Sequence, residues 1–82
     1  MNDDAGLDEA LRRIFQRVFE MLPQSITDDT RRGQSERWDS LGHLELLEAL
    51  SQEFKIEIPP EEALQMDTFA AVRQTVRQLR SQ

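Results

Sequence analysis

The residues with the clearest potential for chemistry are Ser40, His43, Glu45 and Glu48, which lie within nine positions of one another. Ser40 offers a hydroxyl nucleophile, His43 an imidazole and the glutamates carboxylates, so a hydrolytic triad is conceivable. If these residues share one helix, however, its surface offers no oxyanion hole and no pocket that excludes water. We therefore predict no catalytic residue, and we expect His43 to be an exposed helix residue.

The composition narrows the possible functions. The 82 residues fit a single domain spanning 1–82, and they include no cysteine and one histidine. Disulfides and cysteine-based metal sites are excluded, and a histidine-based metal cluster is disfavoured, so we predict no metal site. A net charge of −6 argues against nucleic acid and anionic membranes, and it favours a basic protein partner.

The same sequence indicates where the protein works. No apolar run approaches the roughly 20 residues of a membrane-spanning helix, so we expect no membrane insertion. The first ten residues are acidic and lack the basic start and apolar centre of a secretory signal. We therefore expect a cytoplasmic protein.

Apolar residues three and four apart predict a first helix that ends before Pro23, because proline disfavours helix at the residue before it. We expect residues 1–6 to be disordered. The predicted apolar stripe of this helix is Leu7, Leu11, Ile14, Phe15, Val18 and Leu22.

Residues 23–38 have no sustained apolar period and contain proline, glycine, serine and aspartate, which favour turns. We interpret them as one long loop, and long loops in compact domains are often functional. Ile26 and Trp38 are its large apolar residues, and we expect both to fix the loop to the core.

A second helix should begin at Asp39 or Ser40 and run to about Phe54, with Asp39 capping its first turn. Leu41 and Leu44 lie on a different side from its core face and form a smaller apolar patch beside Ser40. The core face comprises Leu46, Leu47, Leu50 and Phe54.

After a connection at 55–60, a short helix at 61–66 and a last helix capped by Asp67 or Thr68 complete the chain. The last helix has an apolar stripe of Phe69, Val72, Val76 and Leu79. The pattern predicts an all-α fold: a small helical bundle of three main helices plus one short helix, with a long loop between the first and second helices.

A long loop thus delivers Asp39-Ser40-Leu41 to the start of the second helix. Glu45-Leu46 follow one turn later, and Ile56-Glu57-Ile58-Pro59 come after the helix. This arrangement, over about residues 7–80, resembles the acyl carrier protein family, whose hallmark is Asp-Ser-Leu at this position.

The resemblance implies that Ser40 carries a 4'-phosphopantetheine arm, added from coenzyme A by a phosphopantetheinyl transferase that recognises Asp39 and Leu41. The protein would then be a non-catalytic carrier, and acyl groups would travel as thioesters on the arm. Such a carrier must meet several partners in turn, so we expect a monomer.

The resemblance also implies that a short acyl chain can be sheltered between the helices. The expected lining is Leu46, Leu50, Phe54, Ile58, Ala63 and Leu64.

Two departures from fatty-acid carriers concern the pathway. Gly42-His43 replaces an acidic-polar pair that is common in them, and Trp38 precedes the motif where a smaller residue is frequent. The combination looks more like carriers of specialised, polyketide-like biosynthesis than like fatty-acid carriers, and both pathways stay open.

Charge and spacing predict a docking surface. Residues 38–67 contain eight acids and one base, so the negative charge concentrates around Ser40. Positions 41, 44, 45 and 48 share one side of a helix. We predict that Leu44, Glu45 and Glu48, extended by Glu61 and Glu62, bind the transferase and the acyl-loading and acyl-processing enzymes through basic patches on those partners.

Two other functions remain alternatives at this point. An unmodified acidic helical module could present Leu41, Leu44 and the acids to a partner protein. A small serine hydrolase is the more distant reading.

Overall fold

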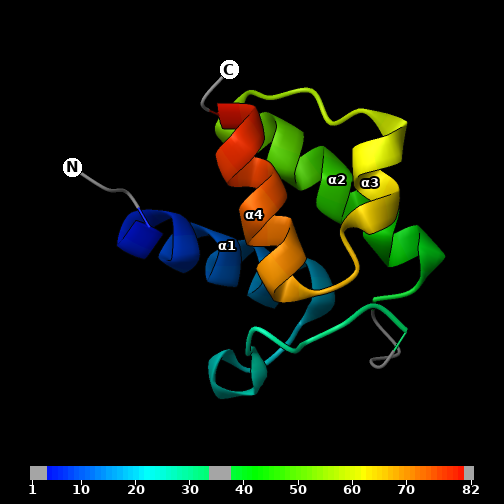
Figure 1. The fold of residues 1–82 in the computed structure, drawn as a ribbon. Coiled ribbons are helices and arrows are strands. Elements are labelled where there is room, and N and C mark those ends of the chain that lie inside the picture. The colour runs from blue at the N-terminus through cyan, green and yellow to red at the C-terminus, as the bar shows by residue number, and fades with distance from the viewer. Residues whose placement is uncertain (1–3, 34–37, 81–82) are drawn as a thin grey trace.

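The computed structural model describes residues 4–33 and 38–80, and in these ranges the protein is all-helical, as predicted, with no strand. Its elements are α1 (Asp4–Phe19), the 3-10 helix η1 (Pro23–Ser25), α2 (Ser40–Phe54), α3 (Pro60–Gln65) and α4 (Phe69–Arg80). Helices α1, α2 and α4 pack against one another, and α3 is the short helix beside the start of α2 (Figure 1).

The core lies between α1, α2 and α4, and the predicted stripes supply most of it. An aromatic cluster occupies its centre: the ring centroid of Phe15 lies 4.9 Å from that of Phe69 and 5.1 Å from that of Trp38. Edge-to-face pairs of this kind each contribute about 0.5–1.5 kcal/mol beyond the area they bury. The buried apolar residues are Leu7, Leu11, Ile14, Phe15, Phe19, Ile26, Trp38, Leu46, Leu50, Met66, Phe69, Val72 and Val76.

The prediction for the end of the first helix was wrong by one turn. Helix α1 ends at Phe19, because Glu20 adopts the left-handed conformation with φ 55°. The chain therefore leaves the helical path before Leu22, which is 63% exposed instead of completing the stripe. Phe19, outside the predicted stripe, is buried and stacks on Trp38 with ring centroids 5.3 Å apart.

The expected disorder of residues 1–6 was also wrong in part. Helix α1 begins at Asp4, so residues 4–6 are helical, and residues 1–3 lie outside the described ranges.

The loop between α1 and α2 is fastened to the core at several points. Ile26 and Trp38 are both buried, which confirms their predicted function. Thr30 and Arg32 exchange backbone hydrogen bonds with Phe69 and Asp67, at 2.8 Å each, so the loop runs beside the α3–α4 connection. This loop end is therefore held by the body of the protein before it reaches α2.

Guanidinium groups hold the first part of the same loop. Arg12 donates to the backbone oxygen of Ile26 at 2.6 Å and to Asp8 at 2.7 Å. Arg73 of α4 donates to Asp8 at 3.0 Å and to Asp28 at 3.1 Å. Side chains from α1, the loop and α4 thus form one network over the Phe69 ring.

Helices α2 to α4 follow the predicted boundaries closely. Helix α2 ends where Lys55 turns left-handed with φ 56°. Pro60 is the first residue of α3, where its missing N–H has no cost. Thr68 caps α4, because its hydroxyl accepts from the backbone N–H of Ala71 at 3.0 Å.

Candidate functional site

Ser40 is the first residue of α2 and is exposed. Trp38, two residues before it, is held in place: its side chain is buried, and its backbone oxygen accepts from the N–H of Gly33 at 2.9 Å. The hydroxyl therefore lies at the end of a rigid helix rather than on a free loop. Such an end favours a nearby anion, because the first amides of a helix point outward and the helix dipole is positive there.

Asp39 caps the helix, as predicted. Its backbone is extended, and one carboxylate oxygen accepts from the N–H of Gly42 at 2.8 Å. A cap of this type stabilises a helix by about 1 kcal/mol relative to alanine. The cap also holds the first turn of the helix, which begins at Ser40.

His43 is where the prediction of an exposed residue was wrong, since only 6% of it is exposed. Its Nδ1 accepts from the indole N–H of Trp38 at 3.0 Å, and its Nε2 lies 2.9 Å from the backbone oxygen of Ala63 in α3. Burial lowers the pKa of His43 below its ordinary value, and the positive charge of Arg32 acts in the same direction, while the hydrogen bond with Ala63 opposes both.

A positional signal for this contact was present in the sequence. Trp38 immediately precedes the cap residue and His43 is the fourth residue of the helix, the two positions that pack together in a hydrophobic staple. Here the pair adds a hydrogen bond, and the two rings stack at 19° with centroids 6.3 Å apart. The expectation of an exposed His43 did not take this position into account, and the position indicates the core.

The predicted docking residues do lie on the surface, on α2 and α3. Leu41 and Leu44 are 66% and 63% exposed, confirming that they point away from the core. Glu45, Glu48 and Glu61 are exposed, and Glu62 is half-buried; in residues 4–33 and 38–80 none of the four forms an ion pair. We call this surface the acidic face: Leu41, Leu44, Glu45, Glu48, Glu61 and Glu62.

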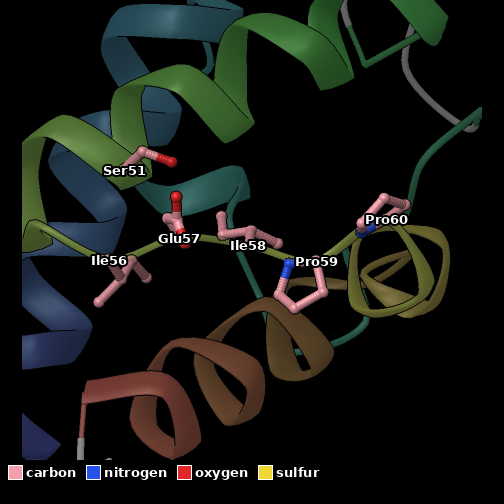
Figure 2. Close-up of a pocket in the computed structure, with 6 residues that line it drawn as sticks. All are labelled: Ser51, Ile56, Glu57, Ile58, Pro59 and Pro60. Atoms are coloured by element: carbon pink, nitrogen blue, oxygen red, sulfur yellow. The ribbon is translucent and has the colours of Figure 1, made fainter.

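The predicted acyl-lining residues are not gathered around one cavity. Leu46 and Leu50 are fully buried in the core, whereas Leu64 is 73% exposed. Phe54, Ile58 and Ala63 are half-buried. Ile58 is the one member of the set that lines an open hollow of about 480 Å³ between α2 and the segment before α3 (Figure 2). The residues around this hollow are Ser51, Ile56, Glu57, Ile58, Pro59 and Pro60.

In the described part of the chain, no group of three or more histidine, aspartate or glutamate residues is placed to hold a metal ion. Among the same residues, no helix has both the length and the apolar character needed to cross a membrane.

The start of α2 thus presents an exposed serine directly after an aspartate cap, near carboxylates that form no ion pair with any described residue. Comparison with known protein families gives a match to the phosphopantetheine attachment site family over residues 9–76, which includes this helix end and most of the bundle. The matched range covers 68 of the 82 residues. The chain therefore belongs to the phosphopantetheine attachment site family, the carrier domains whose cofactor is phosphopantetheine.

Proposed function

We propose that this protein is a non-enzymatic acyl carrier whose phosphopantetheine is bound to the hydroxyl of Ser40. The observation that supports the assignment is the position of Ser40, exposed at the first residue of α2 and directly after the capping Asp39. The family match fixes the cofactor, and this helix end has the features that the cofactor needs: an accessible hydroxyl for the ester bond and a helix N-terminus beside its phosphate.

The attachment needs no catalytic group from the carrier. A serine hydroxyl is a weak nucleophile until a base takes its proton. We propose that the transferase supplies this base and a metal ion, while Ser40 supplies the oxygen. The Oγ–P bond forms as the pyrophosphate P–O bond of coenzyme A breaks, and adenosine 3',5'-bisphosphate leaves. Asp39 then serves as cap and contact for the transferase, together with Leu41.

The arm, once attached, supplies a terminal thiol on which an acyl group is held as a thioester. The carrier needs no cysteine for this chemistry, and its sequence contains none. A flexible tether of this kind raises the effective concentration of the acyl group at any enzyme docked on the carrier. Docking, rather than chemistry, is the contribution of the protein surface.

Intact mass after incubation with coenzyme A and a broad-specificity transferase tests the attachment. The wild-type protein should gain one phosphopantetheine and Ser40→Ala none, with unchanged helical content. Ser51→Ala is the matched control, because Ser51 lies on the same helix and is half-buried; it should be modified as the wild type is. Modification of Ser40→Ala would reject Ser40, and an unmodified wild type would favour an unmodified interaction module.

We propose that the acidic face is the docking surface for the transferase and for acyl-loading and acyl-processing enzymes with basic patches. Its two exposed leucines supply a small apolar centre, and its carboxylates supply a charged rim, a composition typical of transient interfaces. Because these carboxylates lack intramolecular ion pairs within the described residues, a partner's cations meet no competitor among those residues.

We also propose that the bundle shelters a short acyl chain by opening between α2 and α3. Leu46 and Leu50 are closed in the core, so we propose that the chain enters past the half-buried Phe54 and Ile58, which pack against this core, and past the half-buried Ala63 of α3. Backbone and methyl NMR shifts of these residues should change when the arm carries a medium-length acyl group. A response confined to the surroundings of Ser40 would show that the chain stays in solvent.

For the pathway, we propose specialised, polyketide-like biosynthesis rather than fatty-acid synthesis. The support is the resemblance noted for Trp38 and Gly42-His43, although these residues also have a packing function in the staple. The holo-protein should be loaded poorly by the malonyl transferase of a fatty-acid system. Loading as efficient as that of a fatty-acid carrier would favour the fatty-acid pathway.

A further inference from the structure

The side chain of His43 joins three segments around Ser40. It extends from α2 into the interior, contacts Trp38 at the end of the loop and reaches the backbone of Ala63 in α3. Its own backbone N–H is bonded to the oxygen of Asp39 at 2.8 Å, so the ring is fixed to the helix end that presents Ser40.

The two partners permit one protonation state of the ring. The indole of Trp38 can only donate, so Nδ1 must carry no proton. The backbone oxygen of Ala63 can only accept, so Nε2 must carry one. The neutral Nε2–H tautomer satisfies both contacts. A proton on Nδ1 would leave the bond from Nε2–H to Ala63 possible, but it would place two N–H groups opposite each other 3.0 Å apart and break the contact with Trp38. A charged ring also favours solvent over this buried site, and a ring that moves out of the site leaves Ala63 as well.

Helix α3 has few other attachments. None of its residues is buried, and its backbone amides at Glu62 and Ala63 bond to Pro59 at the helix's own start. The bond from His43 to Ala63 is a hydrogen bond that connects α3 to α2. The buried Met66 anchors the chain directly after α3.

We propose that His43 is a positioning residue: its neutral ring holds α3, and with it the Glu61–Glu62 part of the acidic face, in register with Ser40, and protonation of the ring releases α3. The inference rests on the proposed carrier function, because it concerns the surface that a transferase would contact. On this proposal, the contacts of His43 with Trp38 and Ala63 align the acidic residues of α2 with those of α3.

The direction of the pH dependence follows from the burial of the ring. Arg32 acts on His43 from the loop by repulsion, Asp39 lies at the start of the same helix, and Glu61 and Glu62 precede Ala63 on α3. Because the pKa of His43 is lowered in the folded protein, the unfolded chain binds a proton more readily. The contribution of His43 to stability is thus complete above the ordinary pKa of 6.5 and is lost as the pH falls towards the folded pKa.

Two substitutions separate positioning from packing. His43→Gln keeps one acceptor and one donor at similar reach but does not titrate, so it should imitate the neutral ring at every pH. His43→Leu fills space but can make neither hydrogen bond. Circular dichroism and thermal melts identify any variant that fails to fold, and His43→Gln keeps the test decisive if His43→Leu is too unstable.

The first measurement needs no modification of the protein. In the apo wild type, ring-nitrogen NMR should report a bare Nδ1 and a protonated Nε2 on His43. Acidification should shift the indole N–H of Trp38 and the amides of residues 61–65 in the same titration. In His43→Gln these signals should not titrate. A wild type whose α3 amides are insensitive to the protonation of His43 overturns the proposal.

The second measurement is transferase kinetics, with each variant compared to wild type at the same pH so that the titration of the enzyme cancels. His43→Leu should raise KM about 2- to 10-fold with little change in kcat, the range expected for the net value of one hydrogen bond. The kcat/KM of the wild type divided by that of His43→Gln should be constant above about pH 7. On acidification this ratio should fall by about 2- to 10-fold, because only the wild type loses its neutral ring. A constant ratio throughout, or an effect on kcat alone, contradicts positioning.

These outcomes distinguish the two proposals. If the carrier function is wrong, neither the wild type nor any variant takes up phosphopantetheine, yet the NMR titration still reports whether His43 holds α3. If only the positioning is wrong, all variants are modified with one pH profile and the α3 signals do not follow His43.

Discussion

The carboxylates of this protein are used differently in two regions. On the side formed by α1, α4 and the start of the loop, Asp8 and Asp28 are bound by the guanidinium groups of Arg12 and Arg73. On the acidic face, Glu45 and Glu48 have no such partner within residues 4–33 and 38–80. The first region holds a loop in place, and the second carries negative charge that no described residue neutralises in an ion pair.

The apolar residues repeat this difference along one helix. Leu46 and Leu50 of α2 are fully buried, whereas Leu41 and Leu44 are mostly exposed. One helix therefore carries both the interior that stabilises the domain and the surface proposed to bind partners. Substitutions on its two sides should separate stability from recognition.

The largest expected effect is on the buried side. Leu50→Ala should lower the free energy of unfolding by about 2–5 kcal/mol, because it removes a fully buried side chain and leaves a cavity. Leu44→Ala is the matched control on the same helix and should change it by less than about 0.5 kcal/mol. Urea denaturation measures both. Equal losses for the two leucines would show that Leu44 packs internally.

The next effect should be on recognition. Glu45→Lys with Glu48→Lys should lower the transferase's kcat/KM by about tenfold at low salt, because reversed charges repel a basic partner and slow association. Added salt should shrink the difference. The melting temperature should hardly change, since both residues are exposed.

A control of equal net charge tests whether position matters. Glu9→Lys with Glu53→Lys makes the same charge change at two exposed sites outside the acidic face. It should reduce kcat/KM far less than the double reversal near Ser40. Similar losses from both pairs would mean that total charge, rather than the acidic face, governs the encounter.

The smallest effect should come from the ion pair of Asp28 with Arg73, in which Asp28 is exposed and Arg73 is half-buried. The hydrogen bond and charge of Arg73 lower the pKa of Asp28 below its ordinary 3.8. The stability that Asp28 contributes is therefore present above that value and lost as the pH falls through the folded pKa. Asp28→Asn should cost a little stability near neutral pH and nothing in strong acid.

Unfolding curves across this pH range measure the difference, and Asp29→Asn serves as the control because the neighbouring Asp29 is also exposed and has no ion pair with Arg73 among the described residues. If Asp28→Asn and Asp29→Asn behave alike at every pH, the pair with Arg73 contributes nothing to stability.

The sequence predicted the helices well where local rules decide them. The cap at Asp39, the start of α3 at Pro60 and the buried stripe of α4 all depend on residues within a few positions of one another. The exposed positions of Leu41 and Leu44 followed from helical spacing alone. The position of Ser40 at the start of α2 likewise follows from the sequence, because a cap residue and an apolar helical stripe define that boundary.

Only the tertiary structure decided what lies between the elements. Spacing tells which residues share a side of a helix, but not which other segment covers that side. The staple positions of Trp38 and His43 are local, whereas the contact of His43 with Ala63 joins residues 20 positions apart and was not indicated by the sequence. The left-handed conformation of Glu20, which ends α1 early, was likewise not indicated by the sequence, because the apolar spacing of three and four residues continues past Glu20 to Leu22. Contacts between distant segments depend on the whole chain, and no local pattern encodes them.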